Sequence, residues 1–145
     1  MTIETLQQLC IVLSRSSVTV QDVSASLGEL VEDQGGNLPL IIQPSDKSFK
    51  EVVIVRKYGT QEPAHIRLEI AESLKLSVQE LKRVFGEYRE LPKKDWDSPE
   101  SIIFKVYMPD ASHDCAIIAD VESGEQGIED GTAFSIIVRR DIKLD

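Results

Sequence analysis

The sequence has neither a long apolar run nor a basic leader. It begins Met1-Thr2-Ile3-Glu4, with an acid where a secretory leader carries Lys or Arg. No apolar run approaches the length of about 20 residues that crosses a bilayer. These absences predict a protein without a targeting segment or membrane span, and we expect a cytoplasmic location.

Cysteine and aromatic side chains are scarce. Aromatic residues make up only 6% of the chain, so the core is expected to be aliphatic. The two cysteines, Cys10 and Cys115, lie far apart in apolar runs and lack the CxxC spacing of a metal site. This pattern favours two reduced, buried thiols in an intracellular protein, with a disulfide as the less favoured alternative.

Motifs that would identify an enzyme are also missing. The chain has no glycine-rich phosphate loop, GxSxG elbow or HExxH helix. One segment, 110–115, brings His113 close to Cys115 and suggests a nucleophile with a base. Its Asp and Ser content is more typical of a turn, and a thiol that opens an apolar strand is inert. We therefore predict a non-catalytic protein that holds no cofactor and no metal.

Positive charge is in short supply. Twenty-five acids face 16 bases, so the formal net charge is −9. The phosphates of nucleic acids and anionic membranes repel such a chain, which disfavours both as partners. Acidity also promotes solubility, which is the simpler interpretation. No Lys or Arg occurs between Lys105 and Arg139. We expect the acids of this stretch to form a rim of hairpin loops that faces a basic protein partner: Asp120, Glu122, Glu125, Glu129 and Asp130.

The only tryptophan, Trp96, lies in a polar linker between Leu91 and Glu100. A Trp in such a segment is typical of a binding anchor. The favoured interpretation is instead that Trp96 folds back over the open edge of the core, since tryptophan is buried on average. Trp96 and the acidic cluster are nevertheless the candidate binding residues that the sequence offers.

The sequence does contain a regular order of helix and strand patterns, at a length typical of a single domain, 1–145. Apolar stripes at helical spacing predict helices over 3–13, 19–31 and 77–88, the last two opening with capping residues Thr19 and Ser77. Six further runs predict strands over 38–43, 51–57, 65–70, 102–108, 115–121 and 134–139. The alternation of 65–70 is typical of an antiparallel sheet covered on one face.

The two predicted helices at 19–31 and 77–88 resemble each other. Thr19-Val20-Gln21-Asp22-Val23 aligns with Ser77-Val78-Gln79-Glu80-Leu81, and Gly28-Glu29 aligns with Gly86-Glu87. A glycine inside a helix costs about 1 kcal/mol, so its presence in both indicates a close approach of helix to sheet. Either the segments 17–72 and 75–141 are a duplication, or capping and amphipathicity imposed similar residues twice.

A duplication predicts the α+β class: an antiparallel six-stranded sheet built from two tandem α-β-β-β units. An extra N-terminal helix would precede them, and the helices would lie mainly on one face. In the alternative repeat phase, the strand 65–70 is the first element of a strand-helix-strand-strand unit, and that element order is similar to duplicated small-molecule-binding modules of the GyrI type.

We expect a non-catalytic protein-binding module, such as an adaptor, chaperone or immunity-type protein, that acts through an acidic surface or an open sheet face. The chain resembles secretion chaperones in size, acidity and mixed fold, although those commonly end in a helix and this chain ends in a strand. The alternative is a small-molecule sensor with a ligand cleft between the two units. A homodimer is compatible with both.

Overall fold

The computed structural model describes residues 2–33 and 35–143. Within them the chain forms three helices and one antiparallel sheet of nine strands, in the predicted α+β class. The helices are α1 (Thr2–Leu13), α2 (Val20–Leu27) and α3 (Val78–Phe85). The strands are β1 (Gly28–Asp33), β2 (Leu40–Pro44), β3 (Phe49–Arg56), β4 (Pro63–Ile70), β5 (Leu76–Ser77), β6 (Tyr88–Glu90), β7 (Glu100–Val106), β8 (His113–Gly124) and β9 (Gly127–Ile142).

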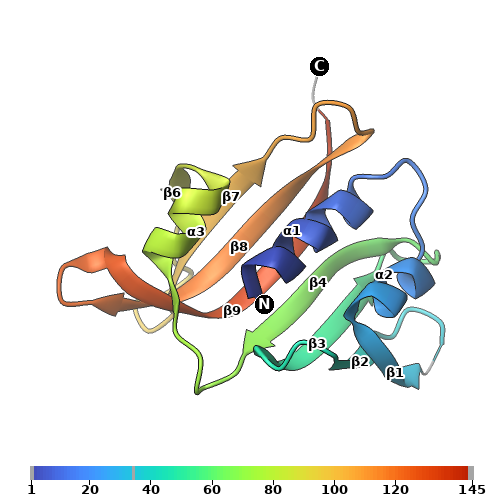
Figure 1. Ribbon diagram of the computed structural model, residues 1–145, viewed down its shortest axis with the longest axis horizontal. Helices are drawn as coiled ribbons and strands as arrows, with labels where there is room; N and C mark the ends of the chain where they lie inside the picture. Colours follow the sequence, from blue (N-terminus) through green and yellow to red (C-terminus); the bar gives the residue numbers. More distant parts are fainter. Residues whose placement is uncertain (1, 34, 144–145) are drawn as a thin grey trace.

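The sheet is continuous from one edge to the other. Its strand order is β1-β2-β3-β4-β9-β8-β7-β6, and the short β5 pairs with β9 beside this path. Strands β1 to β4 are neighbours in chain order, and so are β6 to β9 (Figure 1). The pairing of β4 with β9, which sets Ile66 opposite Val138, joins these two groups.

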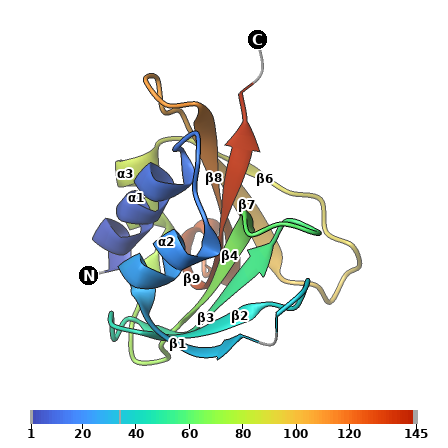
Figure 2. The same ribbon diagram turned by 90° about the vertical axis from the view of Figure 1, so that its right-hand side faces the viewer.

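The core lies on one face of the sheet. Figure 2 shows all three helices on the same side, which agrees with the predicted placement. Alternate strand residues, among them Ile66 and Ile117, point toward the helices and are fully buried. Helix α1 contributes Leu6, Leu9 and Leu13, each at most 1% exposed. No helix among the described residues is long and apolar enough to cross a membrane.

The predicted six strands and two tandem α-β-β-β units are wrong in number and arrangement. Strands β1, β5 and β6 were not foreseen, and the structure shows no tandem units of that form. The error begins at two glycines. Gly28 and Gly86 do not lie inside helices but are the C-caps of α2 and α3, with φ of 158° and 90°. Each helix therefore ends earlier than predicted, and the chain continues as a strand.

These two glycines provide a matched test of the fold. Gly86→Ala is expected to cost about 1 kcal/mol, because its φ disfavours a side chain although nothing lies within 4 Å of the added Cβ. Gly28→Ala is expected to cost more, about 2–3 kcal/mol, because its Cβ would also lie 2.0 Å from the carbonyl oxygen of Gln43. Urea unfolding measures both. Equal costs would contradict the close approach of Gly28 to β2.

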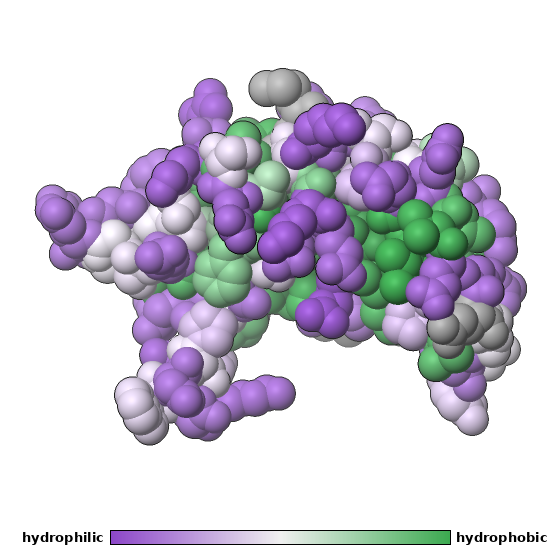
Figure 3. All heavy atoms as spheres, turned by 90° about the horizontal axis from the view of Figure 1, so that it is seen from below, coloured by the Kyte–Doolittle hydropathy of each residue, from purple (hydrophilic) through white to green (hydrophobic). Residues whose placement is uncertain are grey.

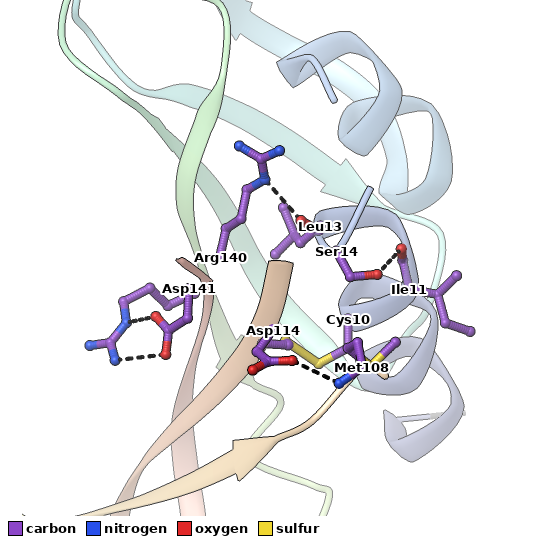
Figure 4. The surroundings of a disulfide bond; sticks show 10 residues. Cys10, Ile11, Leu13, Ser14, Met108, Asp114, Arg140 and Asp141 are labelled. Atoms are coloured by element: carbon purple, nitrogen blue, oxygen red, sulfur yellow. Dashed lines mark hydrogen bonds and ion pairs between the residues drawn. A yellow bond between two sulfur atoms is a disulfide. The ribbon is translucent and has the colours of Figure 1, made fainter. Parts of the chain in front are cut away.

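The prediction of two reduced thiols is also wrong. Cys10 of α1 and Cys115 of β8 form a disulfide, with Cα atoms 5.5 Å apart across a sequence separation of 105 residues (Figure 4). Both side chains are buried, at 2% and 0% exposure. The apolar runs had shown that the cysteines are buried, but not that α1 crosses the sheet over β8. Disulfides persist in oxidising compartments, which speaks against the expected cytoplasmic location.

The disulfide is expected to stabilise the attachment of α1. Replacing both cysteines, Cys10→Ala with Cys115→Ala, should lower the free energy of unfolding by about 2–4 kcal/mol, the usual range for such a bond. Urea unfolding of the double variant and of the wild type treated with a reductant should give the same shift. Unchanged stability in both would show that no disulfide forms in solution.

Candidate functional site

No described helix lies on the face of the sheet opposite α1, α2 and α3, here the open face (Figure 2). Strand residues that alternate with the core positions point toward this open face, and the strand pairing arranges them in rows across the sheet. One row, here the apolar row, crosses six strands at Ile41, Val53, Arg67, Ile137, Ile118 and Ile103, and ends on β6 at Arg89.

A second row, here the basic row, lies two residues along the strands from the apolar row. It holds His65, Arg139 and Lys105, with Val55 and Ala116 between or beside them. Both cations contact one carboxylate: Lys105 Nζ lies 3.0 Å from Asp141 Oδ2, and Arg139 Nε lies 2.6 Å from Asp141 Oδ1. One carboxylate therefore serves two cations, and the cluster keeps one positive charge in excess.

A third row, here the acidic row, lies on the other side of the apolar row. It holds Glu51, Glu69, Ser135, Asp120 and Ser101. Glu51 and Glu69 stand directly opposite each other on β3 and β4, a like-charge pair that disfavours folding. Lys50 relieves it only loosely, at 3.9 Å from Glu69. The charges of the open face are thus segregated on two sides of an apolar centre.

Two arginines stand at the apolar row without a carboxylate. The side chains of Arg67 and Arg89 are exposed, and neither makes an ion pair with another residue in 2–33 or 35–143. They bring positive charge to the open face of a chain whose net charge is −9. They are the groups of the site most available to an external carboxylate.

Loops project beyond the open face at both ends. Figure 3 shows the two projections, with a hollow between them. The linker between β6 and β7 carries Trp96, which is 89% exposed, and the β3–β4 turn carries Tyr58, which is 85% exposed. Within the hollow, a depression of about 340 Å³ is lined by Arg67, Asp120 and Phe134 among others.

The structure separates the binding residues predicted from the sequence. Asp120 lies on the open face, where it accepts a hydrogen bond from the Ser101 hydroxyl at 2.6 Å. Trp96 lies on the projecting linker and does not fold back over the core. The other four acids, Glu122, Glu125, Glu129 and Asp130, lie on the β8–β9 hairpin.

The four acids of the β8–β9 hairpin differ in their hydrogen bonds. Glu129 accepts hydrogen bonds from the Tyr88 hydroxyl at 2.7 Å and from Gln79 Nε2 at 2.8 Å, so it fastens the hairpin to α3 and β6. The Tyr88 hydrogen bond lowers the pKa of Glu129, while burial and the same bond raise the pKa of Tyr88 to about 12. Asp130 accepts from the Gln126 backbone amide in the hairpin turn. Glu122 and Glu125 remain exposed.

The pair His113 and Cys115 does not form a nucleophile and a base. The sulfur of Cys115 is bonded to Cys10, so Cys115 offers no free thiol for His113 to activate. His113 Nδ1 instead lies 2.8 Å from the Ser112 hydroxyl. No group of three His, Cys, Asp or Glu side chains among the described residues is arranged to hold a metal ion.

Comparison with known proteins finds no relative. No protein-family model matches the chain, and no curated protein or solved structure matches it significantly. The site is therefore interpreted from its own geometry.

The pKa of His65 reports the positive charge of the arginines that surround it on the open face. Burial lowers the pKa of His65, and the positive charges of Arg67 and Arg139 lower it further. An NMR titration should place the His65 pKa below 6.5. Arg67→Gln removes one of the two repelling charges, so the pKa should rise, while Arg83→Gln on α3 should leave it unchanged. A His65 pKa that does not respond to Arg67→Gln would contradict this arrangement.

Proposed function

We propose that this protein is a non-catalytic protein-binding module that docks its partner on the open sheet face. The observation that supports it most is the apolar row, whose aliphatic side chains are half-buried except for the buried Ile103, with segregated charges on its two sides. Cores of protein interfaces combine apolar centres with charged rims in this way. Adaptors, chaperones and immunity-type proteins are the classes that such a module fits.

The dimensions of the face are adequate for a specific complex. Six strands spaced at about 4.8 Å and strands of eight residues at about 3.3 Å give a projected area of roughly 600 Å². The projecting loops add to this and bring it near the ~800 Å² that each partner buries in a standard interface. Trp96 and Tyr58 are residue types that dominate binding energy when a partner covers them.

A small-molecule sensor is the second candidate. The hollow of about 340 Å³ spans β3, β4, β8 and β9, and so lies over the boundary between the two strand groups where a ligand cleft was expected. A larger hollow of about 800 Å³ lies along β7, with Phe85, Arg89 and Tyr107 in its lining. Small ligands favour sites that enclose most of their surface. The unbroken hydrogen bonding of β4 to β9 keeps the central hollow shallow, which favours a macromolecular partner.

The proposal is tested by a charge reversal on the open face. The purified protein, its Arg67→Glu variant and its Arg83→Glu variant are each used to capture partners from a native extract. Arg67 and Arg83 are both exposed, but Arg83 lies on α3, on the covered side. A partner that binds the open face should be held by the wild type and by Arg83→Glu and lost, by at least about tenfold, with Arg67→Glu. Equal capture by all three, or no capture by any, would contradict the proposal.

A further inference from the structure

The geometry of the open face points to one kind of occupant. We infer that it binds an amphipathic α-helix of a partner protein, whose acidic side chains lie on one flank and basic side chains on the other. This inference rests on the proposed function and adds the shape and the charge pattern of the partner.

The width between the charged rows matches a helix. His65 of the basic row and Glu69 of the acidic row are four residues apart on β4, a distance of about 13 Å at 3.3 Å per residue. An α-helix with its side chains is about 10–12 Å across. A helix that lies on the apolar row therefore has one charged row along each flank.

The apolar row also matches a helix in length and period. From Ile41 to Ile103 it crosses six strands, or about 24 Å, which is the length of a helix of roughly 16 residues. One helical turn rises about 5.4 Å and neighbouring strands are about 4.8 Å apart, so each turn of the helix meets a new strand. Apolar anchors at spacings of three and four residues can then contact successive strands.

The charges of the two rows determine which flank of the partner helix is acidic and which is basic. Lys105 and Arg139 have only Asp141 between them, and Arg67 has no carboxylate among the described residues, so the flank over the basic row is acidic. Glu51 and Glu69 repel each other across the β3–β4 pair, so the flank over the acidic row is basic. A partner with this pattern relieves both imbalances at once.

Other occupants fit the face less well. An extended strand binds through free backbone groups, which lie at the edges of a sheet and not on its face. A second copy related by a two-fold axis along the apolar row would set basic row against acidic row. The same operation would also set Arg67 against Arg67 and each projecting loop against its own counterpart.

The experiment uses two helix-stapled, fluorescent 16-residue peptides of one composition. Both carry Leu at helical spacing. In the segregated peptide, Glu occupies one flank of the helix and Lys occupies the other. In the mixed peptide, each flank carries Glu and Lys in equal number. Fluorescence anisotropy should show the segregated peptide binding at least about tenfold more tightly, because only it meets opposite charge on both sides. Equal affinity, or no binding of either peptide, would overturn the inference.

Protein variants locate the bound peptide. Glu51→Lys with Glu69→Lys should weaken the segregated peptide about tenfold and improve a third peptide that has Glu on both flanks. The matched control, Glu4→Lys on α1 with Glu80→Lys on α3, lies on the covered side, makes the same change in net charge and should alter affinity less than about twofold. Equal weakening by both pairs would overturn the inference.

The two proposals can fail separately. If the extract yields a partner that Arg67→Glu loses, while the segregated peptide gains nothing over the mixed one, the open face is a docking surface for something other than this helix. If the peptide pattern is confirmed but no protein is captured, the surface recognises helices and its role as a partner-binding module fails.

Discussion

The hydrogen-bonded pairing of β4 with β9 is the constraint on which the rest of the structure depends. It joins two groups of chain-consecutive strands into one sheet and fixes their register. A slip of one residue would exchange Ile66 and Leu68, which face the helices, with Arg67, which faces solvent. The burial of the core and the three rows of the open face are therefore two consequences of the same register.

Attachment of the helices to one face is what leaves the other free. Helix α1 is held by its leucines, by the disulfide to β8, and by Arg140 of β9, whose Nε donates to the Leu13 carbonyl oxygen at 2.9 Å (Figure 4). All these contacts lie on the covered side. The open face is left with partly buried aliphatic side chains between two rows of charge. That surface fits a partner that brings its own apolar stripe and opposite charges.

The sequence predicted the class, the three helices and the one-sided sheet, because amphipathic period and alternation are local signals. It missed β1 and β6, because Leu30 and Val31 extend the apolar pattern of α2 and because both terminal glycines were assigned to helix interiors. The disulfide was missed because nothing local reports which strand a helix crosses.

The candidate site could be predicted only in part, because a single sequence does not report which strands lie side by side. The acidic cluster was adjacent in sequence, but its members lie on a sheet face and on a hairpin. The three rows are assembled across strands by register, which a single sequence does not specify. One signal was present. In the predicted strand 65–70, His65, Arg67 and Glu69 occupy the wet face, and each belongs to a different row.

The central claim, that one face of the sheet is open and the other sealed, is tested most directly on the isoleucine methyl groups. A soluble, uncharged paramagnetic reagent should strongly relax the NMR signals of Ile41, Ile118 and Ile137 on the open face. It should spare Ile54, Ile66 and Ile136, which are 0% exposed beneath the helices. Equal relaxation of the two sets, or relaxation of the core set alone, would contradict the account.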